Sequence, residues 1–358
     1  MSAWKTSATY LAKQGLIRAG MEAVALSRAG RLLPQAAGRG MILTLHHVRP
    51  EQGPRFLPNA HLSVTPRFLA QAVEAALEAG LTPVQLHDLP RLLADPQDSR
   101  RFVAFTLDDG YRDNIEHAAP VFRRFAVPYT IFITRGFIER TRTIWWETAE
   151  ALLTGISSFT FDSGAGPERV SSATPVERHH AFARLAGLVH AIDEDEAVAR
   201  IDEAARDNGI DPVGIVNDLV MTADELRALS ADPLFRAGAH TLTHVNLARV
   251  DEARLAREIG QSAEAVAGWC GYRPESFCYP YGTREAVSTK TQAAVVEAGF
   301  ACAVTTRPGV LRPRDRGAPA LFPRVSLNGH YQKKRYVEVL LSGIPFIGSS
   351  RSSAPFSQ

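Results

Sequence analysis

Two carboxylates and two histidines stand where apolar runs of the sequence end. Asp108 and Asp109 directly follow the run FVAFTL at 102–107, and His240 and His244 follow a second such run. Adjacent carboxylates are costly to bury unless a cation compensates them. Histidines four residues apart on a helical turn point the same way, as metal ligands do. Joined with Asp109, they would hold one divalent metal ion and leave coordination positions open for water and substrate.

Two further motifs also follow apolar runs. His46 comes after MILTL, and Pro280-Tyr281-Gly282 follows a run that ends at Tyr279. Proline fixes φ and glycine allows a left-handed turn, so this loop could present a backbone N–H as an oxyanion donor. Each motif also has a plainer explanation. The acids could cap a helix, the histidines could be packing residues, and Pro-Tyr-Gly could be an ordinary turn.

The elements that would position these residues alternate between short apolar runs and helical stretches. Such a rhythm predicts a parallel sheet covered by helices, and the carboxyl ends of parallel strands form a common ligand face. A threonine N-cap before a proline opens one helix at 65–66, and a capping box opens another at 222–225. The predicted strands are 41–45, 102–107, 129–134, 235–239, 276–279 and 301–304.

The rhythm divides the chain into three parts. Residues 41–330 form the predicted catalytic unit, in which 140–220 breaks the alternation and is interpreted as an inserted hairpin with helices. Residues 1–40 carry six basic side chains against the single acid Glu22 and predict a basic amphipathic helix. Residues 331–358 predict a C-terminal helix followed by a frayed tail.

Composition excludes several classes of protein. The 358 residues include 40 basic and 38 acidic side chains, so charge indicates no nucleic-acid partner. Three cysteines without a CxxC pair cannot build a disulfide framework and suit a reducing compartment. No apolar run resembles a secretory signal or a membrane span, which predicts a cytoplasmic location. The N-terminal helix would either pack on the main domain or lie on the inner membrane as a peripheral contact. Nothing in the sequence indicates the oligomeric state.

In their order along the chain, Asp108-Asp109-Gly110, His240-xxx-His244 and Pro280-Tyr281-Gly282 resemble the polysaccharide deacetylase family, the NodB-homology carbohydrate esterases. The resemblance implies an α/β fold, a distorted (β/α)7-type barrel, here carrying the insertion. It also implies metal-dependent removal of N-acetyl groups from an amino-sugar glycan, polymeric or lipid-linked, by metal-activated water. Zinc is the family's usual ion.

The resemblance assigns roles by position. Asp109, His240 and His244 would hold the metal, and Asp108 would be the general base. The main-chain N–H of Tyr281 would stabilise the oxyanion.

Two departures from the family pattern stand out. Cys278 occupies the place of an arginine that usually holds the catalytic carboxylate in position, so the residue that orients Asp108 is open. The late Leu-x-His motif has no convincing copy, which leaves His330 as a reserve candidate. His46 resembles the early histidine of a circularly permuted subgroup and is assigned as general acid.

The substrate contacts predicted from the sequence are Tyr111, Trp146, Pro280 and Gly282, and the expected partner is an N-acetylated glycan. Aromatic side chains can stack on sugar rings, although aromatic pairs more often belong to a core. Two other functions compete with this hypothesis. One is a glycan-binding protein on a retired catalytic scaffold, favoured by the lost arginine. The other is a hydrolase of a small cyclic amide or imide, which the intact Asp-His-His set disfavours.

Overall fold

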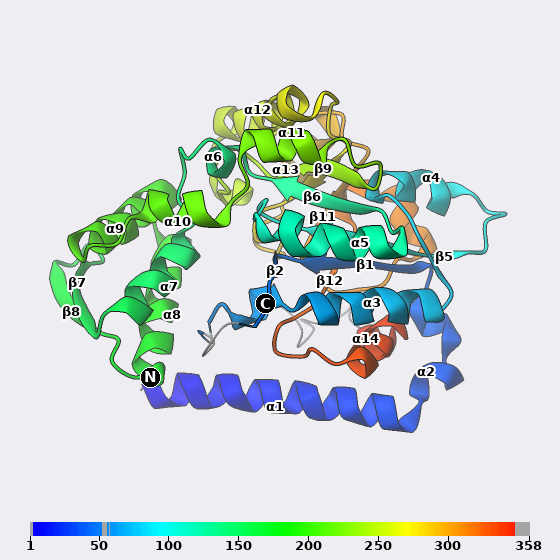
Figure 1. Cartoon of the computed structure of the whole chain (residues 1–358), viewed down its shortest axis with the longest axis horizontal. Helices are drawn as coiled ribbons and strands as arrows, with labels where there is room; N and C mark the ends of the chain where they lie inside the picture. The colour runs from blue at the N-terminus through cyan, green and yellow to red at the C-terminus, as the bar shows by residue number, and fades with distance from the viewer. Residues whose placement is uncertain (1–2, 52–55, 57, 348–358) are drawn as a thin grey trace.

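A curved parallel β-sheet forms the centre of the protein, and helices pack around it (Figure 1). The computed structural model describes residues 3–51, 56 and 58–347. The strand order is β11-β10-β9-β6-β5-β1-β12, with β4 added beside β5. The strands are β1 (Gly40–Leu45), β4 (Leu81–Pro83), β5 (Arg101–Leu107), β6 (Tyr129–Ile133), β9 (Phe235–Ala239), β10 (Ser276–Cys278), β11 (Cys302–Val304) and β12 (Val325–Ser326).

The seven strands on the main path curl into a half-barrel whose two edges approach each other. Phe322 joins these edges: its main-chain N–H donates to the carbonyl of Ala303, and its carbonyl accepts from the N–H of Thr305, both at 3.0 Å. Three residues later the chain enters β12 and pairs with β1. The predicted α/β barrel-type fold is therefore confirmed, whereas the sequence analysis missed the short strands β4 and β12.

The helices begin where capping residues predict them. Thr65 accepts a hydrogen bond from the N–H of Phe68 at 3.2 Å, and Thr222 and Glu225 form the expected capping box. These side chains satisfy N–H groups that have no partner within the helix. The helices around the barrel are α3 (Pro66–Glu78), α4 (Leu89–Ala94), α5 (Ala119–Phe125), α6 (Arg135–Ile138), α11 (Ala223–Leu229), α12 (Glu252–Cys270), α13 (Thr289–Glu297) and α14 (Lys334–Leu341).

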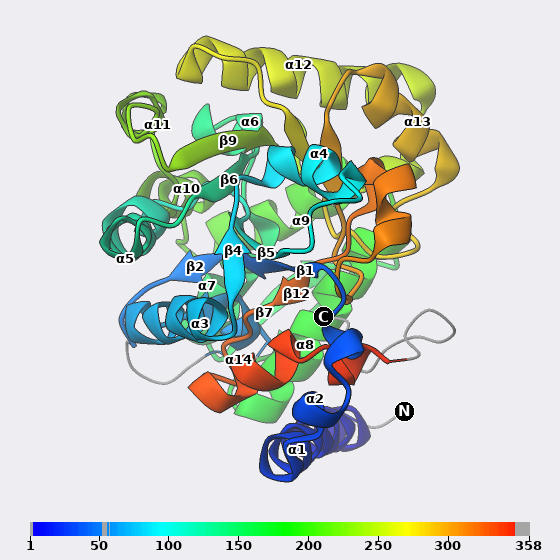
Figure 2. The ribbon, with the colours of Figure 1, turned by 90° about the vertical axis from the view of Figure 1, so that its right-hand side faces the viewer.

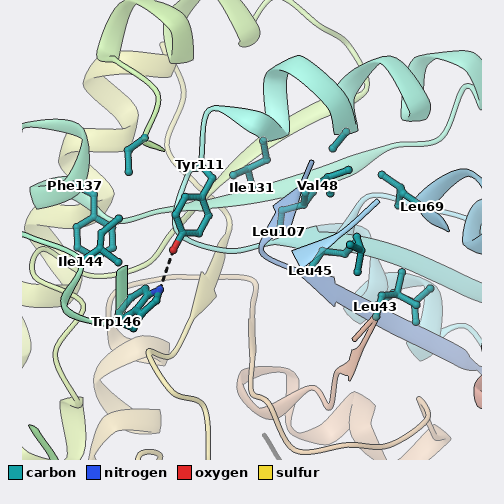
Figure 3. Close-up of a cluster of buried hydrophobic side chains, with 14 of the residues drawn as sticks. Leu43, Leu45, Val48, Leu69, Leu107, Tyr111, Ile131, Phe137, Ile144 and Trp146 are labelled. Carbon is teal, nitrogen blue, oxygen red and sulfur yellow. Dashed lines mark hydrogen bonds between the residues drawn. The ribbon is translucent and has the colours of Figure 1, made fainter. Parts of the chain in front are cut away.

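The largest apolar cluster lies against one face of the sheet (Figure 3). Leu43, Leu45, Leu107 and Ile131 are fully or almost fully buried there, and helix α3 adds Leu69. Strands covered on both faces have no solvent side, which explains why β1 and β5 read as continuous apolar runs. The same burial fixes the strand ends that carry the polar motifs.

The insertion forms a separate group of elements to one side of the sheet (Figure 1). The predicted hairpin is present as an antiparallel pair, and helices surround it. Apolar side chains of α7 join the main cluster, so the insertion shares a core with the barrel. Its elements are α7 (Trp145–Gly155), β7 (Ser158–Asp162), β8 (Pro167–Ser171), α8 (Pro175–Ala191), α9 (Glu194–Asp207) and α10 (Pro212–Leu219).

The N-terminal helix α1 (Ala3–Ser27) packs against both α8 and α14, and Figure 2 shows α1 at the bottom of the view, below these two helices. Ile17 and Met21 are buried on its inner face. Leu16 and Leu26 of the same helix instead expose 74% and 82% of their surface.

After α1 the chain continues into the short helix α2 (Ala29–Leu32). Among the described residues, no helix is both long enough and apolar enough to cross a membrane. The predicted frayed tail, from residue 348 onward, lies outside the described residues.

Candidate active site

The polar motifs meet at one end of the half-barrel because each follows a neighbouring parallel strand. The N–H of Asp108 continues the β1–β5 ladder by donating to the carbonyl of Leu45 at 3.0 Å. The N–H of His240 does the same toward Ile133 of β6, also at 3.0 Å. The ladder hydrogen bonds therefore place side chains that are 132 residues apart in one buried cluster.

Asp109, His240 and His244 form a buried group with the composition of a divalent-metal site. Oδ1 of Asp109 lies 3.6 Å from Nε2 of His240 and 3.5 Å from Nε2 of His244. That oxygen has no hydrogen-bond partner within the described part of the chain. Nδ1 of His240 lies 2.7 Å from the carbonyl of Cys278, which fixes its proton there and leaves the Nε2 lone pair directed at Asp109.

The protonation states also suit a cation. Burial lowers the pKa of both His240 and His244, so the imidazoles are neutral, as metal ligands must be. Burial and the neighbouring Asp108 raise the pKa of Asp109 well above its ordinary value. An unpaired buried carboxylate is costly, and a cation between these three side chains would remove that cost.

The two histidines do not lie on a helical turn, so the geometric reason given for pairing them is wrong. They lie on an irregular loop after β9, in which Thr241 (φ 68°) and His244 (φ 56°) are left-handed. Asp109 is also left-handed, with φ 74°. Such conformations cost about 1–3 kcal/mol each in non-glycine residues and concentrate at functional sites. The loop still brings both imidazoles to Asp109.

Two buried acids hold this loop in place. Glu258 of α12 accepts hydrogen bonds from the N–H groups of Leu242 and Thr243 at 2.8 and 3.0 Å. Glu194, at the start of α9 in the insertion, accepts from the N–H of Asn246 at 2.9 Å. The loop that carries His244 is therefore attached to both the barrel and the insertion.

Arg324 orients Asp108, the role left open by Cys278 at the position of the family arginine. Its two terminal nitrogens donate to the two carboxylate oxygens of Asp108, each at 2.7 Å, and the guanidinium is fully buried. It also donates to the carbonyl of Thr305 and to the Sγ of Cys278, at 3.0 and 3.1 Å. Burial acts to raise the pKa of Asp108, but the guanidinium outweighs it and lowers that pKa below its ordinary value. Sequence reasoning missed Arg324 because it stands 216 positions from Asp108, outside any recognised motif.

His46 also lies near Asp108, with its Nε2 3.9 Å from Oδ2 of the carboxylate. Burial lowers the pKa of His46 to about 3, so the imidazole is neutral at pH 7. His330, the reserve candidate, packs its ring 6.5 Å from that of His61. The contact with Asp108 favours His46 as the general acid.

The Pro280-Tyr281-Gly282 loop presents a main-chain donor beside the metal set. Tyr281 (φ 62°) and Gly282 (φ 60°) are left-handed, and a Cβ at Gly282 would lie 2.5 Å from the N of Thr306, so only glycine fits there. The N–H of Tyr281 makes no hydrogen bond to a main-chain carbonyl among the described residues. Its hydroxyl donates to Glu194 at 2.5 Å, and its ring lies 5.4 Å from that of His244.

Two predicted sugar contacts are core residues in this structure. Tyr111 is completely buried, and its hydroxyl accepts a hydrogen bond from Nε1 of Trp146 at 3.0 Å (Figure 3). Its ring contacts that of His47 with centroids 3.6 Å apart, and Nδ1 of His47 lies 2.5 Å from a carboxylate oxygen of Asp113. Trp146 is 8% exposed and packs 4.9 Å from His244. Tyr111 therefore has no exposed surface on which a sugar could stack. The ring of Trp146 packs against the metal-ligand candidate His244, and Tyr111 packs against Trp146.

Comparison with known proteins agrees with this geometry. The family model for polysaccharide deacetylase matches residues 95–303, which include Asp108, Asp109, His240, His244 and Tyr281. The chain therefore belongs to the polysaccharide deacetylase family. The match covers neither His46 nor Arg324. No curated protein matches the sequence.

Solved structures of deacetylases share the fold. The deacetylase PplD of Streptococcus pyogenes, in complex with acetate, is 14% identical with a TM-score of 0.53, over 81% of this chain and 92% of that one. A polysaccharide deacetylase from Bacillus cereus is 14% identical with a TM-score of 0.52, over 84% and 68%. IcaB from Ammonifex degensii is 17% identical with a TM-score of 0.51, over 85% and 96%. These similarities show the seven-strand half-barrel of NodB-type deacetylases.

Proposed function

We propose that the protein hydrolyses the N-acetyl group of an amino-sugar glycan with the help of one divalent ion, which we take to be zinc. The observation that carries this proposal is the unpaired, buried Oδ1 of Asp109 between two neutral imidazoles. Two nitrogens and one oxygen are a ligand set that zinc prefers in catalytic sites. When bound, the ion would polarise the acetyl carbonyl and lower the pKa of a water molecule.

The remaining chemistry belongs to the chain's own residues. Arg324 keeps Asp108 ionised. Asp108 takes a proton from a water molecule while the oxygen of that water attacks the amide carbon. The N–H of Tyr281 donates to the oxyanion, an interaction worth roughly 3–4 kcal/mol in comparable sites. His46 delivers a proton to the nitrogen as the C–N bond breaks, and acetate and a free amine leave. Because burial keeps His46 neutral, the proton that it delivers is the one that Asp108 took from water, passed across the 3.9 Å between the carboxylate and Nε2. Negative charge that develops on the substrate favours this transfer.

The structure weakens one competing hypothesis. The glycan-binding alternative rested on the loss of an arginine before the third motif, and Arg324 supplies a guanidinium to Asp108 from elsewhere in the chain. A protein that only bound glycan would not need an ionised, bidentately held carboxylate beside a possible metal site.

Metal analysis and acetate release together test the proposal. Asp108→Asn should abolish turnover and leave the bound metal unchanged, because Arg324 holds the Asp108 carboxylate and Asp109 supplies the acidic ligand of the metal set. His240→Ala should lose the metal. Near-wild-type turnover in Asp108→Asn would show that the base is another group, and purified protein without stoichiometric metal would contradict the mechanism.

A further inference from the structure

A largely apolar cavity of about 550 Å³ lies beside the candidate active site, and α1, α8, α14 and β12 contribute most of its walls. This volume is in the range of ligand pockets rather than of packing defects. Its walls come from regions far apart in the sequence, which only the folded chain brings together. Apolar side chains that line it include Ile17, Met21, Phe182, Leu327, Val337 and Leu340.

Two residues that line the cavity contact the catalytic groups. Arg324 lines it and holds Asp108 at 2.7 Å. Thr306 also lines it and donates a hydrogen bond to the carbonyl of Tyr281 at 2.6 Å. A molecule that filled the cavity would therefore place its inner end within one side chain of the proposed base and of the oxyanion donor.

On the basis of the proposed deacetylase function, we propose that the substrate is an amino sugar joined to a lipid, and that the hydrocarbon chain of this lipid occupies the cavity. A water-soluble glycan gains little from an apolar wall, since hydroxyl groups placed against it would lose their hydrogen bonds to water. Each methylene transferred from water into such a site strengthens binding about fourfold. The cavity therefore favours a hydrocarbon chain as its occupant.

The helix that forms the outer wall supports this assignment independently. The three most exposed large apolar side chains among the described residues all lie on α1 and α2: Leu16, Leu26 and Leu32. Basic residues accompany them, Arg18 and Arg28 among these. Exposed leucines with cations are typical of helices that lie on anionic bilayers. A lipid-linked substrate would be drawn from such a surface.

The test is acetate release from β-glycosides of N-acetylglucosamine that carry methyl, octyl or dodecyl tails, used below their micelle concentrations. We expect KM to fall at least about a hundredfold from methyl to octyl, because seven further methylenes are buried. Gly187 on α8 lines the cavity, and a Cβ there meets no atom within 4 Å. Gly187→Phe should narrow the cavity, remove the tail effect and keep turnover of the methyl glycoside.

Gly268→Phe on α12 is the matched control, because this helical glycine has equally open surroundings and lines none of the described cavities. It should behave as wild type toward every tail. Equal KM values for all tails in the wild type would overturn the lipid inference and leave the deacetylase proposal intact. The same holds if Gly187→Phe keeps the full tail effect.

Calorimetric titration with the dodecyl glycoside separates the two proposals if no glycoside releases acetate. Binding to the wild type and Gly268→Phe, with at least about tenfold weaker binding to Gly187→Phe, would support the cavity while the deacetylase proposal fails. Absence of binding to the wild type would overturn the cavity assignment as well.

Discussion

Replacing Arg324 with methionine should remove the buried guanidinium that compensates the charge of Asp108. The guanidinium is fully buried and bidentate, so the variant leaves a buried carboxylate without its partner. Breaking a buried ion pair in this way costs about 3–5 kcal/mol in the free energy of unfolding. Urea unfolding at pH 7 measures that loss.

The same substitution should change the pH dependence of turnover. In the wild type the pKa of Asp108 is below its ordinary value, so the carboxylate is ionised throughout the neutral range. Without Arg324, burial dominates and raises this pKa, so the acid limb of kcat/KM moves upward. We expect at least a tenfold loss of acetate release at pH 6, with partial recovery at pH 9.

Asp108→Asn combined with Arg324→Met separates charge compensation from simple packing. The double variant has no carboxylate to compensate, so it should be more stable than the sum of the single losses predicts, with a coupling energy of about 2–3 kcal/mol. Additive losses, or a wild-type pH profile in Arg324→Met, would refute the assignment of Arg324 as the residue that orients the base.

Three further predictions follow from the structure. Burial disfavours charge on His47, but Asp113 and Glu147 outweigh it and raise the pKa of His47 to about 9. The contribution of His47 to the free energy of unfolding is therefore full below pH 6.5 and is lost as the pH rises through about 9. Asp113→Asn should flatten this pH dependence in unfolding experiments. His46→Ala should lower kcat at least about a hundredfold and His330→Ala less than threefold, and the opposite order would transfer the general acid to His330. The intact chain should float with vesicles that contain 30% phosphatidylglycerol and not with vesicles of pure phosphatidylcholine. If it floats with neither kind of vesicle, the proposed membrane contact is wrong.

The sequence predicted the strands that carry the site because parallel strands buried on both faces are continuous apolar runs. The runs before His46, Asp108 and His240 each become a strand within one residue of the expected bounds. The fourth, before Tyr281, ends one residue early, at Cys278. Helix starts were equally predictable, since capping residues act on their own neighbours in the chain.

What the sequence could not show depends on contacts between distant segments. Arg324 stands before a two-residue strand too short to have a periodicity, so neither β12 nor its ion pair was visible. The i and i+4 spacing of His240 and His244 fits a helical turn and an irregular loop equally well. The left-handed residues that make it a loop leave no trace in composition. The aromatic side chain of Tyr111 predicts a sugar contact, but residue type alone does not show whether a ring faces the substrate or the core.

Titration of chelator-treated protein with zinc tests the central proposal most directly, with bound metal and acetate release measured on the same samples. We predict one ion per chain, acetate release that rises in proportion to occupancy, and no bound ion in His240→Ala. Acetate release that survives complete removal of metal, or undiminished zinc binding in His240→Ala, would contradict the proposed metal centre.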